Sequence, residues 1–213
     1  QTSGRGQRGN SWESDPDKNL LFSTVIFPEF LEARRQFLIS QIISLAIKEE
    51  LDTYTTDISI KWPNDIVING KKICGILTEM SAQFDYINHI VIGIGINVHN
   101  ESFPEELQDH AGSLLLECGK RVHRADLIEA FLEEFERLYA IYLKTEDLSA
   151  LQEEYDQLLV NRGRQVRVLD PKEPFEGKAM GITKKGELIV DTWESRKLVS
   201  SGEVSVRGIY GYV

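Results

Sequence analysis

The sequence predicts an α+β fold, in which a mixed, largely antiparallel sheet packs against helices and is followed by a small C-terminal β-barrel. The first part carries apolar runs typical of strands, at 19–26, 58–61, 66–68, 72–80 and 90–98. From Arg164 onward the apolar residues recur with a period of two. The charge also changes, from 14 Lys and Arg against 27 Asp and Glu in 1–160 to 10 against 7 in 161–213. We therefore expect two domains, residues 1–160 and 161–213.

The first domain is expected to hold one strand, one long helix and then a hairpin. The run 19–26 reads as a buried strand, and 30–51 as a helix with apolar residues three or four positions apart. Pro63 interrupts the strand that begins at Ile58. Asn69-Gly70 is a strong two-residue hairpin signal between 66–68 and 72–80. These elements give a sheet with a helix packed on it.

Two further helices and five short strands complete the prediction. The stretch 125–143 carries one apolar face, and 148–159 follows Asp147, which we expect to be its N-cap. After them come short strands separated by Gly, Pro and Lys-Lys-Gly turns, at 166–169, 175–179, 187–191, 197–199 and 204–207. About fifty residues of this kind are typical of an SH3-like barrel.

Composition excludes several functional classes. The net charge of −10 over 213 residues argues against a nucleic-acid-binding surface, which needs clustered Lys and Arg. The sequence contains no apolar window of membrane-spanning length and no signal peptide. Cys74 and Cys118 are far apart, which fits a reducing cytoplasm. The chain starts without methionine, so we expect the front of the first domain to be missing.

A glycine-arginine loop opens the chain. Residues Gly4 to Gly9 match the dinucleotide fingerprint G-x-G-x-x-G, which requires a preceding strand and a following helix. Only three residues precede the loop, and turn-forming residues follow it. The dinucleotide interpretation therefore fails. A flexible loop with Arg5 and Arg8 is instead suited to an anion, although an ordinary surface loop has the same composition.

Two later segments carry further polar residues at strand ends. Residues 61–65 read Lys-Trp-Pro-Asn-Asp, and Lys72 stands three residues before Gly75, at the mouth of a strand. The run 93–98, Gly-Ile-Gly-Ile-Asn-Val, permits close approach of another group. These residues are suited to joining a carboxylate to a nucleotide, because that reaction requires fixed cations that bring two anions together. The available cations are Arg5, Arg8, Lys61 and Lys72.

The order of these motifs resembles the biotin–protein ligases. A glycine-arginine loop ending in Trp12 is followed by KWPND, by K-x-x-G-I-L-x-E and by GIGIN. The resemblance is dense over residues 1 to about 98 and weaker beyond. It implies a class II synthetase-like fold and an ATP-dependent enzyme. Such an enzyme forms biotinyl-5′-AMP with Mg²⁺ and passes biotin to a lysine of a biotin carboxyl carrier protein domain.

The resemblance also implies roles for single residues. The catalytic group would be Lys72, Arg5, Lys61 and Asp65, with Asp65 also helping to hold Mg²⁺ that is bound mainly through phosphates. The biotin-binding residues would be Gln1, Gly4, Arg5, Gly6, Gln7, Arg8, Lys72 and Gly75. The nucleotide-binding residues would be Trp12, Asn64, Asn97 and Arg207. Gln7 departs from the arginine of some members, and the biotin-cradling segment before the loop is absent from the sequence.

Two alternatives stay open at this stage. Lipoate–protein ligases and octanoyltransferases share the architecture, and the glycine-arginine loop with Trp12 is what favours biotin. A biotin-sensing repressor is the other alternative, should a DNA-binding domain precede the recorded start. In each enzyme reading the acceptor is a folded carrier domain, and a homodimer is possible through exposed strand edges.

Overall fold

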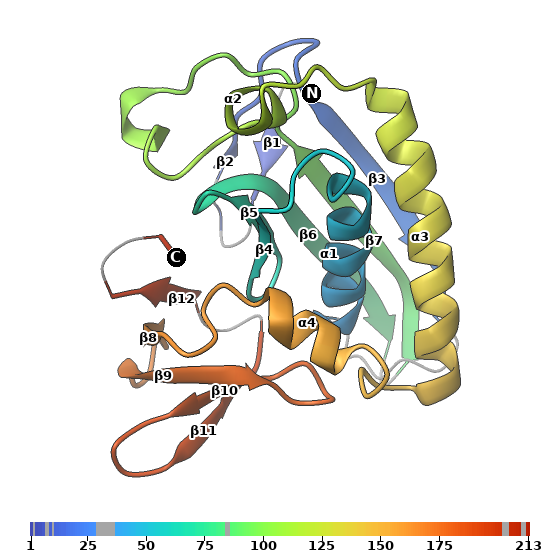
Figure 1. Ribbon diagram of the computed structural model, residues 1–213. Helices are drawn as coiled ribbons and strands as arrows, with labels where there is room; N and C mark the ends of the chain where they lie inside the picture. Colours follow the sequence, from blue (N-terminus) through green and yellow to red (C-terminus); the bar gives the residue numbers. More distant parts are fainter. Residues whose placement is uncertain are drawn as a thin grey trace.

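A five-stranded antiparallel sheet forms the centre of the first part of the chain. The computed structural model describes residues 1, 3–6, 9, 11–28, 37–83, 86–201, 205–209 and 212–213. The strand order is β3-β7-β6-β5-β4 (Figure 1). The bounds are β3 Leu20–Ile26, β4 Ile58–Lys61, β5 Asp65–Ile68, β6 Lys71–Gln83 and β7 Tyr86–Ile96. A separate two-stranded ribbon pairs β1, Gly4–Arg5, with β2, Ser11–Trp12.

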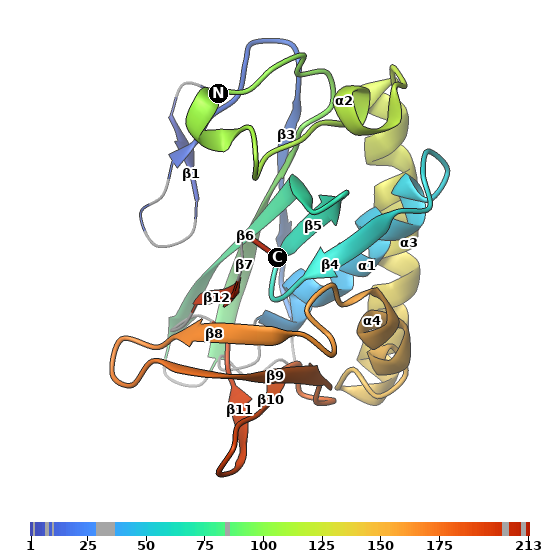
Figure 2. The same ribbon diagram turned by 60° about the vertical axis from the view of Figure 1, so that its left-hand side comes forward.

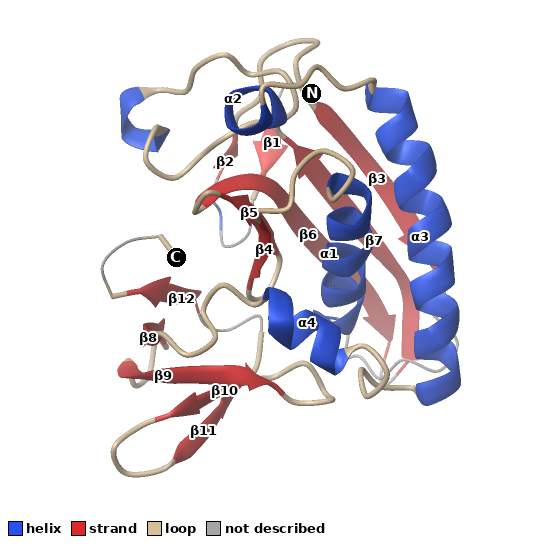
Figure 3. Ribbon diagram, in the orientation of Figure 1, coloured by secondary structure: helices blue, strands red, loops and turns tan. Residues whose placement is uncertain are grey.

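Helices cover one face of this sheet (Figure 3). Helix α1, Phe37–Leu51, is buried along nearly its whole length, and α3, Arg124–Thr145, packs beside it. Phe131 of α3 meets Phe22 of β3 edge to face, with ring centroids 5.4 Å apart. The two long helices were predicted, but the first residues of the expected helix 30–51 lie outside the described residues. The candidate site described below lies on the opposite face of the sheet.

The hairpin turns follow from local sequence. Asn69 and Gly70 both have positive φ, 53° and 76°, as their two-residue turn requires, so this prediction is confirmed. The β6–β7 hairpin is longer than its apolar runs suggested. Polar residues carry the ladder outward, with Ser81 opposite His89 and Gln83 opposite Tyr86. Apolar runs alone therefore marked only the buried half of this hairpin.

Helix α4 corrects one prediction. It spans Gln152–Leu158 rather than 148–159, and its N-cap residue is Leu151. The Asp147 side chain does not cap it. Its Oδ1 accepts the backbone N–H of Ser149, which closes a local turn instead. The chain is not yet helical between Asp147 and the start of α4, where the backbone N–H of Leu148 donates to Lys184 O in the C-terminal part.

The C-terminal part forms a second antiparallel sheet of SH3-like size, in the order β11-β10-β9-β8-β12 (Figure 2). Its strands are β8 Gln165–Leu169, β9 Phe175–Ile182, β10 Leu188–Asp191, β11 Arg196–Val199 and β12 Ser205–Gly208. The α+β class, the antiparallel sheets and this small β unit are thus as predicted. Two short helical segments, α2 at Leu114–Cys118 and a 3-10 turn at Glu105–Leu107, lie between β7 and α3.

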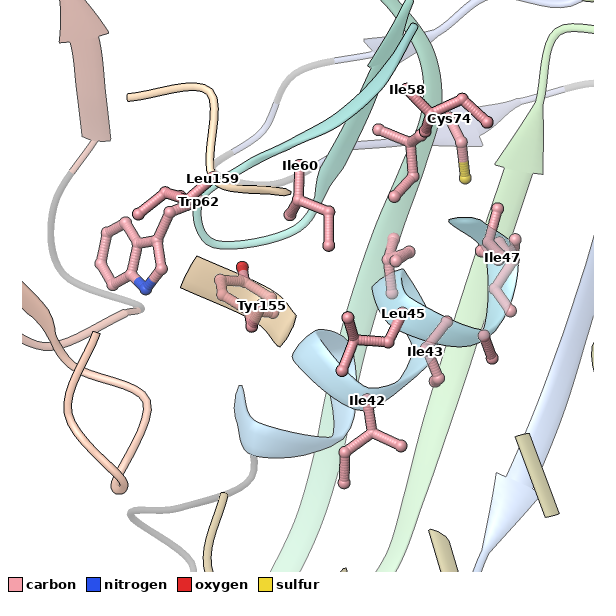
Figure 4. Close-up of a cluster of buried hydrophobic side chains, with 14 of the residues drawn as sticks. Ile42, Ile43, Leu45, Ile47, Ile58, Ile60, Trp62, Cys74, Tyr155 and Leu159 are labelled. Atoms are coloured by element: carbon pink, nitrogen blue, oxygen red, sulfur yellow. The ribbon is translucent and has the colours of Figure 1, made fainter. Parts of the chain in front are cut away.

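The buried core runs from the first sheet into the junction with the C-terminal part. Figure 4 shows Trp62 and Tyr155 beside Ile60 and Leu159, with the α1 side chains below them. Trp62 Nε1 donates to Gly186 O at 3.0 Å, and the amide of Gln41 donates to the same carbonyl at 2.8 Å. Cys74 is fully buried, as expected of a core residue. Among the described helices, none has the length and apolar character to cross a membrane.

Candidate active site

One row of residues crosses the open face of the first sheet. Antiparallel register places Lys61 opposite Asp65, Asp65 opposite Gly75, Gly75 opposite Gly95, and Gly95 opposite Leu21. Residues that stand opposite one another point to the same face of a sheet. The motif at 61–65 and the glycine-rich run at 93–98, which are far apart in sequence, thereby form one surface. Its centre is two glycines and one end is charged.

The glycine pair makes room for an indole ring. A methyl group on Gly95 would lie 2.7 Å from Cε2 of Trp12, and one on Gly75 would lie 2.9 Å from its Cζ3. The absence of side chains at these positions therefore lets the ring lie against the sheet. The Trp12 Nε1 atom is buried and has no hydrogen-bond partner among the described residues. It is a free donor within the site.

A compact charge cluster occupies the other end of the row. Lys72 Nζ lies 2.6 Å from Asp65 Oδ1, and Lys61 Nζ lies 4.0 Å from Asp65 Oδ2. Lys72 Nζ also stands 5.5 Å from the ring centre of Trp12. The β4–β5 hairpin and the start of β6 bring these side chains together. The motif Lys-Trp-Pro-Asn-Asp and Lys72 thus share one carboxylate.

Burial and charge set the protonation of this cluster. Burial lowers the pKa of Lys61 to about 8, and the nearby charge of Asp65 opposes that decrease. Burial by itself would raise the pKa of Asp65. The charge of Lys72 and then that of Lys61 outweigh it, so the pKa of Asp65 lies below its ordinary value. Asp65 is therefore ionised at neutral pH.

The C-terminal part contributes two residues to the same end. Arg207 of β12 and Tyr212 both line the cleft, and the Arg207 Cζ atom lies 5.4 Å from the centre of the Tyr212 ring. The Tyr212 hydroxyl donates a short hydrogen bond to Asp65 Oδ2. The sequence indicated Arg207 only through the resemblance. Nothing local in the sequence pointed to Tyr212.

The whole surface forms the floor and walls of a cleft of about 950 Å³. Gln1, Arg5 and Gly6 line its mouth. Arg5 Nη2 lies 3.5 Å from Glu79 Oε2, and the Arg5 side chain is 75% exposed. Gly4 pairs with Trp12 across the β1–β2 ribbon. The remaining loop residues proposed for biotin, Gln7 and Arg8, lie outside the described residues.

The amide side chains divide into structural and unpaired groups. Asn64 Nδ2 donates to Ile76 O at 2.5 Å and ties the 61–65 turn to β6. Asn97 Nδ2 donates to Gly112 O, whereas its Oδ1 is buried without a partner among the described residues. The same holds for Asn100 Oδ1, which also lines the cleft and which the motif analysis missed. Its position in the loop after β7 was the available signal.

The donor set does not form a self-contained metal site. Within the described part of the chain, no three His, Cys, Asp or Glu side chains are grouped to hold a metal ion. Both oxygens of Asp65 are already engaged, one by Lys72 and the other by Tyr212. The cluster is instead cationic on balance, because Lys61 and Lys72 lie beside one carboxylate and Arg207 stands nearby over the Tyr212 ring. Such a surface is suited to holding anions and a planar group beside them.

Two protein-family models match most of the chain between them. Residues 1–97 match the biotin/lipoate A/B protein ligase family, and residues 163–207 match the biotin protein ligase C-terminal domain. The fold is therefore that of an acyl-protein ligase class. The chain belongs to the biotin–protein ligase family, as the order of its motifs indicated.

Individual relatives agree with this assignment. The chain is 36% identical over 210 residues to the bifunctional ligase/repressor BirA of Bacillus subtilis (strain 168), covering 97% of this chain and 64% of that protein. It is 28% identical to the biotin–[acetyl-CoA-carboxylase] ligase of Mycobacterium tuberculosis, covering 96% and 75%. A biotin protein ligase of Aquifex aeolicus, solved with biotin and ATP, superposes with a TM-score of 0.85 at 28% identity, covering 96% and 84%. The chain thus spans less than two thirds of the BirA relative.

Proposed function

We propose that this chain is the catalytic portion of an ATP-dependent biotin–protein ligase. In this proposal it joins biotin to AMP and then passes biotin to a lysine of a biotin carboxyl carrier protein domain. The observation that carries the proposal is the row of Lys61, Asp65, Gly75 and Gly95, with Lys72 bound to Asp65. It combines a cationic end and an open, flat floor in one cleft. The Aquifex relative solved with biotin and ATP supports the same reading.

The first step needs two anions to meet. An oxygen of the biotin carboxylate attacks the α-phosphorus of ATP, the bond to the β-phosphate oxygen breaks, and pyrophosphate leaves. Lys72, which Asp65 orients at 2.6 Å, would neutralise the carboxylate and the reacting phosphate. Lys61 and Arg207 would face the phosphates from the other side. Arg5 and its loop, with Gln7 and Arg8, would close over the product.

The remaining contacts divide between the two substrates. Gln1, Gly4, Gly6 and Gly75 are proposed to border biotin, because they line or shape the mouth and the floor. Trp12, Asn64 and Asn97 are proposed to border the nucleotide. The unpaired Trp12 Nε1 and Asn97 Oδ1 atoms supply one donor and one acceptor for such a ligand. Buried polar atoms of this kind are otherwise costly.

The second step transfers the acyl group. The neutral amine of the carrier lysine attacks the acyl carbon of biotinyl-5′-AMP, AMP leaves, and the amine loses its proton to form the amide. The partner is therefore a folded carrier domain, consistent with the acetyl-CoA-carboxylase ligase relatives. A homodimer and a cytoplasmic location also stay proposals, as does the division into domains 1–160 and 161–213.

Magnesium is proposed to reach the site with the nucleotide. It would neutralise phosphate charge during the first step. Because Lys72 Nζ holds one oxygen of Asp65 at 2.6 Å, this carboxylate is suited to an outer contact with the ion rather than to being its main ligand. The phosphates would supply most of the coordination.

ATP–pyrophosphate exchange tests the proposal. Biotin, lipoate and octanoate would each be supplied to the folded protein, since the matched family includes lipoate ligases as well. Exchange with biotin alone is expected. Exchange only with lipoate or octanoate would move the chain to the other acyl class, and no exchange with any acid would contradict the ligase proposal. Repressor activity, which the name of the BirA relatives includes, is not proposed for the residues described.

A further inference from the structure

Tyr212 occupies the cationic end of the cleft although it is 147 residues from Asp65 in sequence. Its hydroxyl donates to Asp65 Oδ2, and Lys61 Nζ lies 4.0 Å from the centre of its ring. Arg207 lies over the same ring at 5.4 Å, and the His110 ring is 5.8 Å away. Next to it, Val213 Cγ2 lies 3.4 Å from where a methyl group on Gly70 would stand. Tyr212 and Val213 thus each lie against the first part of the chain.

This placement covers the cations that an anionic substrate needs. The Lys61 side chain is only 6% exposed. An aromatic face binds an ammonium or guanidinium group, but it brings no negative charge to it. A phosphate would bind the same groups more strongly. Tyr212 and a phosphate therefore compete for Lys61 and Arg207.

We propose that Tyr212 is a displaceable cover of the nucleotide end of the cleft. The inference rests on the proposed function, because it takes a nucleoside triphosphate as the incoming ligand. In the closed arrangement Tyr212 holds Asp65 and shields Lys61. When the triphosphate binds, Tyr212 leaves, and Asp65 keeps its bond to Lys72. Nucleotide binding is then coupled to release of the Tyr212 side chain.

The cover has a measurable cost in affinity. If it is closed in about 90% of molecules, the apparent dissociation constant for the nucleotide is about tenfold weaker than that of the open cleft. Removing the ring should recover this factor. Removing only the hydroxyl should recover part of it, because the ring still lies between the two cations.

Two measurements on the whole chain test the cover. The variants are Tyr212→Ala, Tyr212→Phe and, as a control, Trp193→Ala, which removes a fully exposed aromatic ring from the β10–β11 turn. The first measurement is the rate at which an amine-reactive reagent labels Lys61, followed by mass spectrometry without nucleotide. The second is the dissociation constant for Mg²⁺–ATP by calorimetry in the absence of biotin.

We expect Tyr212→Ala to label Lys61 faster and to bind ATP about tenfold more tightly, with Tyr212→Phe in between and Trp193→Ala unchanged. Unchanged labelling of Lys61, or weaker ATP binding by Tyr212→Ala, would overturn the cover. Weaker binding would make Tyr212 a ligand contact instead. If no variant binds ATP, the proposed function fails, and the labelling rate still decides whether Tyr212 shields Lys61.

Discussion

Replacing Lys72 by methionine separates its chemical role from its packing role. Methionine keeps an unbranched apolar side chain beside Gly75 and Trp12 but removes the ammonium group that lies 2.6 Å from Asp65. Breaking a buried ion pair costs about 3–5 kcal/mol. Here Lys61 and Tyr212 continue to hold Asp65, so we expect a smaller loss of folding stability, about 1–2 kcal/mol. The fold should therefore persist.

The loss of activity should be much larger than the loss of stability. Removing one group that stabilises developing charge typically lowers the rate about 10²–10³-fold. The assay is biotin-dependent ATP–pyrophosphate exchange, with thermal unfolding measured on the same samples. The neighbouring Lys71 is a matched control, because it is 38% exposed and its partner Glu117 lies 3.5 Å away. Lys71→Met should change exchange less than about fivefold, since Lys71 does not line the cleft and ion pairs with a partly exposed member contribute little.

The pH dependence of stability provides a second readout for Lys72→Met. The pKa of Asp65 is lowered in the folded protein, so its ion pair stabilises the fold above the unfolded value of about 3.9. That contribution disappears as pH falls through the folded pKa. The difference in unfolding free energy between the wild type and Lys72→Met should therefore shrink in acid. Exchange activity in Lys72→Met that equals that of Lys71→Met would refute the role given to Lys72.

Three further predictions follow from the cleft and its supports. Because the pKa of Lys61 is about 8, kcat/KM should fall about tenfold per pH unit above that pH as the ammonium is lost. Lys61→Arg should move this decrease to higher pH. A decrease at unchanged pH would exclude Lys61 as its origin. Gly95→Ala should weaken biotin and ATP binding by about 1–3 kcal/mol by displacing Trp12, whereas Gly93→Ala, whose methyl group would meet nothing closer than 3.8 Å, should have little effect in the same calorimetric titration. Gly186→Ala should lower the free energy of unfolding by at least about 1–2 kcal/mol, because its φ is +76° and a methyl group would lie 2.2 Å from a buried amide oxygen of α1. Denaturant unfolding measures this change. An unchanged midpoint would show that the turn relaxes freely.

Local sequence accounts for only part of the sheet face that carries the site. Strand alternation places Gly75 and the neighbouring odd-numbered positions of β6 on one side, and the Asn69-Gly70 turn fixes the register with β5. Simple alternation from this turn puts Asp65 and Lys72 on one face and Gly75 on the other, and only the resemblance grouped the three in one candidate site. The bulge between Ile66 and Val67, which periodicity does not encode, shifts the register so that Gly75 stands opposite Asp65.

Long-range contacts were not predictable from the same pattern. Tyr212 reaches Asp65 only because β12 ends beside the cleft, and no spacing rule connects residues so far apart. Trp62 received no role from the motif at 61–65, and its buried indole donates to Gly186 O in the C-terminal part, a contact that no local pattern indicates. Asp147 has the composition of an N-cap, yet a backbone bond to the C-terminal part redirected the chain there. In each case tertiary packing decided among locally equivalent choices.

The Gly186 carbonyl has a practical consequence for protein engineering. It accepts hydrogen bonds from both Trp62 and Gln41, so a turn of the C-terminal part completes the polar bonding of the 61–65 hairpin and of α1. A shortened version of this chain that ends near residue 160 would leave both donors buried without an acceptor, or exposed together with the apolar surface around them. Shortened versions of this chain should therefore retain the β9–β10 turn, and fusion partners are better attached away from it.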